Sequence, residues 1–146
     1  MHKTAQQLAE AAAAAMYARD RASIALGMKL LEVGPGSASM KMPVREDMVN
    51  VHDTCHGGLI FTLADSTFAY ACNSHNKNAV AVTCLIEYMR PACVGDVLTA
   101  SGREQGLEGR NGVYDIRVEN QNGELVALFR GKSMQIKGEV ANLNKR

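Results

Sequence analysis

Residues 56–65 have the sequence HGGLIFTLAD, in which a polar turn with two glycines leads directly into an apolar segment that carries one carboxylate. From Leu59 to Cys72, apolar and small residues recur at spacings of three and four along most faces of the segment. This period predicts an α-helix, and apolar residues on nearly every face predict that the helix is buried. The rest of the chain is therefore expected to wrap around it.

Asp65 is the first functional candidate. It is the only acidic or basic side chain between His56 and His75. An ionised carboxylate on a buried helix is costly unless it is paired, hydrogen-bonded or exposed in a cleft. Asp65 is thus either a catalytic general base or nucleophile, or a structural carboxylate bonded to a loop or to a partner subunit.

Gly57 and Gly58 leave the first amide groups of the predicted helix unobstructed. These amides have no partner inside a helix, and the helix dipole adds partial positive charge there, which would stabilise a carbonyl oxygen that gains negative charge during acyl transfer. Gly57 precedes Asp65 by eight residues, or about 12 Å along a helix axis, which an aspartate side chain cannot span. If one carbonyl needs both groups, they must come from two copies of the chain, so we expect a symmetric dimer with its site between subunits.

Length, composition and net charge limit the class of protein to which this chain can belong. A chain of 146 residues with 47% hydrophobic residues and a net charge of +1 is expected to form one domain, residues 1–146, without a nucleic-acid or membrane-surface partner. No segment approaches the roughly 18 apolar residues of a membrane span. The four cysteines are not in C-x-x-C spacing, which favours reduced thiols in a cytoplasmic protein.

The other predicted elements indicate an α+β fold. An alanine-rich helix is expected within residues 1–20, and a hairpin over 28–33 and 37–44 with a turn at 34–36. Four strands are expected at 79–89, 96–104, 112–120 and 124–136, the first with Val80, Val82, Cys84, Ile86 and Tyr88 on one face. Their short links favour antiparallel pairing, hence a curved sheet around one long helix. Residues 138–146 are expected to form a loose tail.

Asn50, the His56-Gly57-Gly58 turn and Asp65 together resemble the signature of the hotdog-fold acyl-CoA thioesterases. Later blocks at 68–74, 88–91, 112–116 and 128–133 are similar to the phenylacetate-degradation branch of that family. The resemblance covers nearly the whole chain. It implies a hotdog fold, hydrolysis of phenylacetyl or hydroxyphenylacetyl thioesters to free acid and coenzyme A without a metal or redox cofactor, and dimers that pair into homotetramers.

The resemblance also implies a catalytic set of Asp65, Gly57, His56 and Asn50. In it, the Gly57 amide stabilises the oxyanion and Asp65 of the facing subunit supplies the base or nucleophile. Asn50 either orients the water or the carboxylate, or bonds its own loop. His56 is either a general acid for the leaving thiolate or, as we expect, a residue that fixes the loop.

Further candidates concern substrate binding. Gly58 and Thr67 are expected near the substrate, with close packing and a bond back into the helix as their structural alternatives. The phosphates of coenzyme A call for cations, for which the candidates are Arg90, Arg110 and Lys132, each of which can equally be a solvated surface residue. Some relatives carry a helpful serine on the strand after the central helix. Here Ala81 stands at that point and Thr83 is the nearest hydroxyl, so the sequence departs from the family.

Other chemistries fit the sequence less well. Residues 52–56 contain four side chains able to bind zinc, but they cannot all converge on one ion. Cys55 at a helix start is a second candidate nucleophile, ranked below Asp65. The segment at 131–133 lacks the leading glycine of a P-loop, and no G-x-S-x-G motif follows the His-Gly-Gly turn. Two alternative functions stay open: a hotdog dehydratase with His56 as base, and a non-catalytic acyl-CoA-binding protein.

Overall fold

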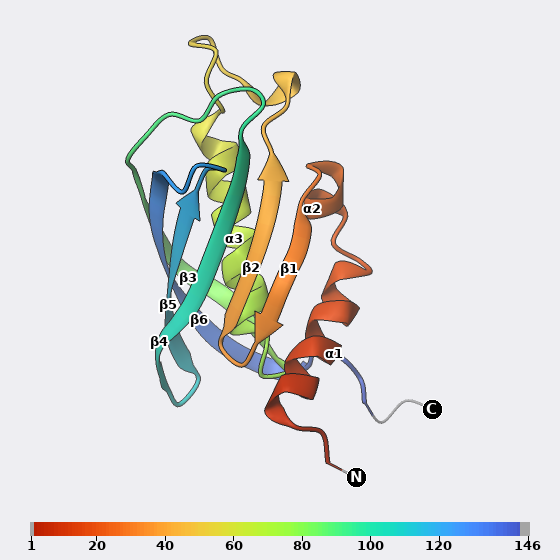
Figure 1. Ribbon diagram of the computed structural model, residues 1–146. Helices are drawn as coiled ribbons and strands as arrows, with labels where there is room; N and C mark the ends of the chain where they lie inside the picture. Colours follow the sequence, from red (N-terminus) through yellow and green to blue (C-terminus); the bar gives the residue numbers. More distant parts are fainter. Residues whose placement is uncertain (1, 144–146) are drawn as a thin grey trace.

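The computed structural model describes residues 2–143, within which six strands form one antiparallel sheet in the order β1-β2-β4-β5-β6-β3 (Figure 1). The helices are α1 (Ala5–Tyr17), α2 (Arg21–Ala25) and α3 (Gly57–Cys72), with a 3₁₀ turn η1 (Glu46–Met48) before α3. The strands are β1 (Lys29–Gly34), β2 (Ser37–Pro43), β3 (Lys77–Tyr88), β4 (Val97–Glu108), β5 (Asn111–Glu119) and β6 (Leu125–Glu139). The predicted α+β fold, with antiparallel strands and a hairpin at 28–44, is confirmed.

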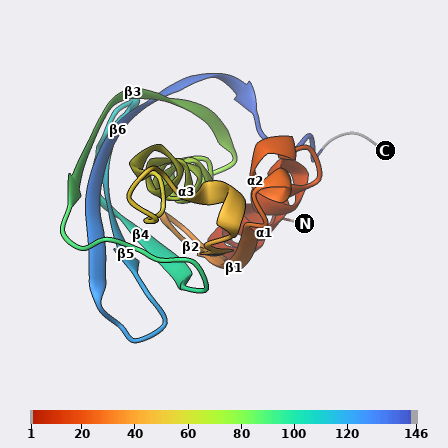
Figure 2. The ribbon, with the colours of Figure 1, turned by 90° about the horizontal axis from the view of Figure 1, so that it is seen from above.

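Helix α3 forms the centre of the molecule. Seen along its axis, it lies in the hollow of the curved sheet, while α1 and α2 lie beside β1 (Figure 2). Leu63, Ala64 and Ala71 are fully buried, and the ring of Phe68 contacts those of Tyr114 and Phe129 at centroid distances of 5.7 and 5.8 Å. The helix is therefore buried on most faces, as its sequence predicts. No helix within residues 2–143 is both long and apolar enough to cross a lipid bilayer.

Strand β3 is an edge of the sheet, because it pairs with β6 alone. A β-bulge at Val82 interrupts this pairing between Ala81 and Thr83. Cys84 and Tyr88 share the face that contacts α3, as predicted, but the prediction that Val80 shares this face is wrong, because the extra residue reverses the alternation of the side chains. Val80 stays exposed, whereas Cys84 packs against the core.

The N-terminal region contains one helix that the sequence predicts and one that it does not. Helix α1 lies within the predicted segment and starts with a capping box at Thr4. Helix α2 was not predicted, because its five residues, capped by Asp20, are too short to show a helical period.

The C-terminal segment is ordered further than predicted. A loose tail from residue 138 is contradicted, since β6 extends to Glu139, which pairs with Lys77. Beyond the strand, the Asn76 side chain donates to the carbonyl of Ala141 and accepts from its amide at 3.1 and 2.8 Å. Backbone pairing of this kind needs no apolar pattern in the sequence. The last part of the predicted tail, 144–146, lies outside the described residues.

Candidate active site

The first turn of α3 contains one unused amide. The amide of Gly58 donates to Nδ1 of His56 at 2.9 Å, and the amides of Leu59 and Ile60 donate to the carbonyl of His56. The amide of Gly57 has no hydrogen-bond partner among residues 2–143. Gly57 is therefore the free donor at the positive end of the helix dipole, whereas the amide of Gly58 is occupied.

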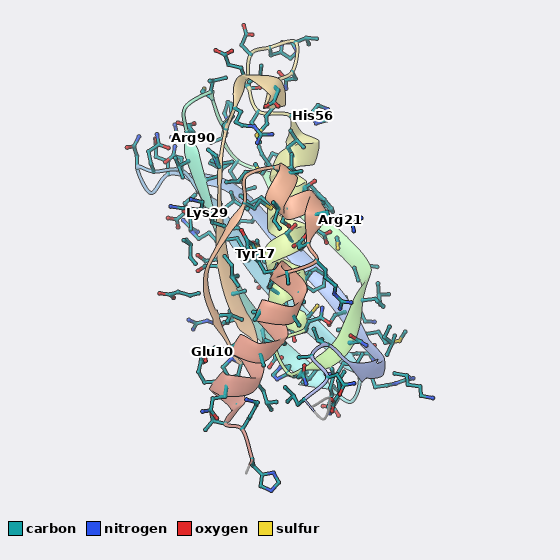
Figure 3. All side chains as sticks on the ribbon, turned by 90° about the vertical axis from the view of Figure 1, so that its right-hand side faces the viewer. Glu10, Tyr17, Arg21, Lys29, His56 and Arg90 are labelled. Carbon is teal, nitrogen blue, oxygen red and sulfur yellow. The ribbon has the colours of Figure 1, made fainter. Side chains whose placement is uncertain are left out.

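A cleft of about 290 Å³ opens beside this turn. Its walls are Gly57 and Ile60 of α3, the neighbouring Cys55, and the segment from Tyr88 to Pro91 that follows β3. Arg90 in this wall forms an ion pair with Glu124 at 2.9 Å. Figure 3 shows His56 and Arg90 at the same end of the molecule, opposite Glu10 on α1. The Tyr88–Pro91 segment, which carries part of the family resemblance, thus borders the unused amide.

Gly57 allows the close approach of Tyr88 to the start of α3. The Tyr88 hydroxyl donates to the carbonyl of Gly57 at 2.7 Å. A Cβ atom on Gly57 would lie 3.2 Å from the Tyr88 ring, closer than an ordinary contact. A side chain at position 57 would therefore push the phenol by a few tenths of an ångström.

Asp65 lies two turns further along the same helix, beside β3. Its Oδ1 is 3.9 Å from Sγ of Cys84. Partial burial raises the pKa of the Asp65 carboxyl above its usual value, and the hydrogen bond from Cys84 offsets part of this rise. A carboxylate with a raised pKa is a better proton acceptor, as a general base requires.

Gly57 and Asp65 of one chain do not meet. They are separated by eight helical residues, about 12 Å of axis. Strand β3 gives a second measure: it contacts Gly57 through Tyr88 and Asp65 through Cys84, four residues apart, which is about 13 Å of extended chain. A single protomer therefore presents the two groups at separate places.

Asn50 and His56 organise the loop before α3. The side-chain oxygen of Asn50 accepts from the amides of His52 and Thr54 at 2.9 and 3.3 Å, which is the structural alternative for this residue. Because Nδ1 of His56 accepts from Gly58, the proton of the neutral ring lies on Nε2. His56 thus presents a proton donor to solvent, which suits the base of a dehydratase poorly.

The remaining substrate-binding candidates lie apart from the cleft. Thr67 is fully buried and its hydroxyl donates to the carbonyl of Leu63 at 2.9 Å, so it is closed to a ligand in the protomer. Arg110 and Lys132 are exposed and have no ion-pair partner in the described part of the chain. Arg110 lies in the turn between β4 and β5, and Lys132 lies on β6 between the buried Gly131 and Ser133, hence on the outer face.

The bulge at Val82 decides which residue of β3 faces Asp65. Ala81 pairs with the buried Ser133, while Thr83 pairs with the exposed Lys132 and points away from α3. Thr83 therefore does not replace the serine of some relatives, and Cys84 lies beside Asp65 instead. Sequence reasoning missed Cys84 and the Tyr88 phenol, because only the register of β3 against α3 reveals their contacts.

The cysteines do not support a thiolate nucleophile. All four are free thiols, and burial raises the pKa of Cys55 to about 11, so this thiol stays protonated at neutral pH. Among residues 2–143, no group of three or more His, Cys, Asp or Glu side chains is arranged to hold a metal ion.

Comparisons with known proteins show which family this chain resembles. The family model described as "Thioesterase superfamily" matches residues 52–127. The acyl-coenzyme A thioesterase PaaI of Escherichia coli is 46% identical over 126 residues, which cover 86% of this chain and 90% of the relative. A putative esterase of Archaeoglobus fulgidus is 39% identical, covering 80% of this chain and 75% of its own.

Solved structures give the same result. The E. coli PaaI protein from the phenylacetic acid degradation operon superposes with a TM-score of 0.92 at 44% identity, covering 93% of this chain and 99% of its own. A mutant of the phenylacetic acid degradation protein PaaI from Thermus thermophilus superposes with a TM-score of 0.75 at 39% identity, covering 78% and 97%. The curved sheet around α3 is thus the fold of these proteins.

Proposed function

Because this chain belongs to the thioesterase superfamily and is an acyl-CoA thioesterase with the hotdog fold, we propose that it hydrolyses phenylacetyl or hydroxyphenylacetyl thioesters of coenzyme A in phenylacetate degradation. The acyl preference is supported by the likeness to PaaI from the E. coli phenylacetic acid degradation operon. The observation that carries the proposed chemistry is the unused amide of Gly57 at the edge of the cleft.

In the proposed reaction, the Gly57 amide donates to the thioester carbonyl oxygen. Asp65 of the facing subunit takes a proton from water while the water oxygen bonds to the carbonyl carbon, and the oxyanion that forms is stabilised by Gly57. The carbon–sulfur bond then breaks, and the coenzyme A thiolate leaves and is protonated. Direct attack by Asp65, through a mixed anhydride, is the second route. Neither route invokes a metal or redox cofactor.

The proposed site lies between two chains that pair along β3. This edge strand exposes apolar side chains, with Val80 43% and Leu85 61% exposed, and an unpaired strand edge favours association with another strand. Two-fold pairing of the β3 edges would set two α3 helices side by side and antiparallel. Each amide of Gly57 could then serve the same carbonyl as Asp65 of the other chain.

A second contact would join dimers into the proposed tetramer. The outer face of the sheet has a depression of about 420 Å³ that includes Leu85 and Leu128 together with the ion pair between Asp115 and Arg130. Exposed leucines flanked by charges of both signs suit contact with a second copy of the same face.

The coenzyme A moiety and the cellular location complete the proposal. Arg90 borders the cleft and is the first candidate for a phosphate, with Arg110 and Lys132 as surface cations that a neighbouring subunit could use. Four free thiols are consistent with the reducing cytoplasm.

The substrate proposal is tested by thiol release over a panel of acyl-CoAs. We expect the highest kcat/KM with phenylacetyl-CoA or its ring-hydroxylated forms. A preference for long straight-chain acyl groups would contradict the acyl assignment and leave the thioesterase activity intact. Loss of water from a hydroxyacyl-CoA with the thioester retained would instead indicate a dehydratase.

The shared site is tested by mixing two inactive variants. Asp65→Asn removes the base, and Gly57→Pro removes the amide proton at a helix position that tolerates proline. Gly57→Ala is the matched control, since it crowds Tyr88 in the same way but keeps the amide. In randomly reassorted dimers half are mixed and each has one intact site, so about one quarter of parental activity should return. No recovery would show that the two groups act within one chain.

A further inference from the structure

The peptide group between Gly57 and Gly58 is held from both sides. Its carbonyl accepts a hydrogen bond from the Tyr88 hydroxyl at 2.7 Å, and its N–H donates to Nδ1 of His56 at 2.9 Å. The first hydrogen bond comes from Tyr88 at the end of β3, and the second is accepted by His56, the residue that caps α3. The adjoining peptide group carries the amide of Gly57, the one without a partner among the described residues.

This peptide group would otherwise be loosely fixed. Helix ends fray, and two successive glycines allow more backbone conformations than any other pair. The first turn of α3 also has no acidic side chain to stabilise its amides. A donor for an oxyanion works only if its direction is set before the reaction. Fixing the peptide plane after Gly57 restricts rotation at its Cα, and so restricts the direction of its N–H.

Tyr88 is poorly explained as a core residue. Its side chain is 51% exposed and borders the cleft rather than the packed interior. Partial burial raises the pKa of its hydroxyl, which therefore remains a donor at neutral pH. The ring lies against Gly57, so the side chain is already in the position needed to hold the helix start.

From this geometry we infer that Tyr88 is a positioning residue for thioester hydrolysis, whose hydroxyl locks the Gly57–Gly58 peptide and thereby aims the Gly57 amide at the substrate carbonyl. The inference rests on the role proposed above for Gly57. It assigns a function to a side chain that touches the oxyanion donor rather than the reacting atoms.

Tyr88→Phe keeps the ring and removes only the hydrogen bond from the hydroxyl to the carbonyl of Gly57. We expect kcat with phenylacetyl-CoA to fall about tenfold, as misdirection of a catalytic group predicts, with KM near the parental value. Tyr17→Phe is the matched control, because the Tyr17 hydroxyl also donates to a backbone carbonyl, that of Met28 at 3.0 Å, in the N-terminal region. Its kcat should stay parental. An unchanged kcat in Tyr88→Phe, or an equal fall in both variants, would overturn the inference.

Infrared spectroscopy separates this inference from the proposal beneath it. Phenylacetyl-CoA labelled with ¹³C at the thioester carbonyl is bound to Asp65→Asn, in which turnover is slow enough for the bound thioester to be observed. Donation by Gly57 lowers the carbonyl stretching frequency, and adding Tyr88→Phe should reduce that lowering. The same lowering in both proteins refutes the Tyr88 role and leaves Gly57 in place. If the carbonyl stretching frequency is not lowered in Asp65→Asn, the Gly57 role is refuted, and the role of Tyr88 in positioning Gly57 is refuted with it.

Discussion

Sγ of Cys84 lies 3.9 Å from Oδ1 of Asp65, so the thiol of an edge strand faces the acidic side chain of the central helix. Burial raises the pKa of the Cys84 thiol to about 11, with the nearby Asp65 charge adding to the effect. The thiol therefore remains a hydrogen-bond donor throughout the neutral range. Burial disfavours the ionised form of Asp65, and the hydrogen bond from the Cys84 thiol partly offsets this effect by favouring the ionised form.

Replacing this thiol should shift the pH dependence of catalysis. In Cys84→Ala the carboxyl of Asp65 keeps its burial but loses its donor, so its pKa rises further. Because Asp65 acts in its ionised form, the acidic limb of the pH profile of kcat/KM should move to higher pH. Cys84→Ser retains a donor and should restore the parental limb. Superimposable profiles for parent and Cys84→Ala would exclude this contact from the mechanism.

Asp65→Asn should lower the catalytic activity and raise the stability of the fold. Loss of the general base is expected to lower kcat by about 10²- to 10⁴-fold, with coenzyme A ligands still bound. A carboxyl whose pKa is raised by folding contributes stability at low pH that is lost as pH rises through the folded pKa. The variant should therefore melt at a higher temperature than the parent at pH 7, with a smaller difference near pH 4. Asp47→Asn, at an exposed carboxylate paired with Arg45, is the control and should change neither property.

Glu104 should contribute stability with the opposite pH dependence. Desolvation raises its pKa, but hydrogen bonds from His75 and Tyr114, at 2.8 and 2.7 Å, outweigh it and hold the pKa below its usual value. This contribution is present above the unfolded pKa and is lost as pH falls through the folded one. Glu104→Gln should lower the free energy of unfolding at pH 7 by about 1–3 kcal/mol.

Denaturant titrations of Glu104→Gln at several pH values provide the check. The loss relative to the parent should shrink on acidification. Glu119→Gln, which breaks the exposed pair with Arg117, should cost no more than about 1 kcal/mol. A loss of equal size at pH 7 and at acid pH would mean that shape rather than charge holds Glu104 in place.

Gly131 should tolerate no side chain. A Cβ atom there would lie 2.6 Å from the ring of Phe68, which is 1% exposed and packed between Tyr114 and Phe129. Gly131→Ala is therefore expected to destabilise the fold by about 1–3 kcal/mol through overpacking. Gly106→Ala is the control, since a Cβ atom at that strand position has no neighbour within 4 Å. Equal melting temperatures for the two variants would contradict the packing of Phe68 described here.

The sequence predicts those parts of the structure that depend on local pattern. The three- and four-residue period of α3 and the glycines at its start follow from residues that are close in the chain, and the unused amide of Gly57 follows from the geometry of any helix start. The opposite faces that Val80 and Cys84 present could not be predicted, because a single bulged residue leaves the composition of β3 unchanged but reverses its alternation.

Long-range contacts explain the other omissions. Tyr88 reaches Gly57 across 31 residues and Cys84 reaches Asp65 across 19, and both contacts depend on the register between β3 and α3. For Asn50 and Thr67, by contrast, the sequence alone already offers hydrogen bonding to their own loop or helix as an alternative to a functional role. Both side chains bond their own loop or helix, as short polar side chains commonly do.

The bulge at Val82 makes the length of β3 as important as its composition. If Val82 instead paired in plain alternation with no bulge, Cys84 would turn toward solvent and its neighbour Leu85 would face the carboxylate. Deletion of Val82 should therefore leave Cys84 beside Asp65, whereas a change of register that closes the bulge and keeps Val82 should move Cys84 away from it.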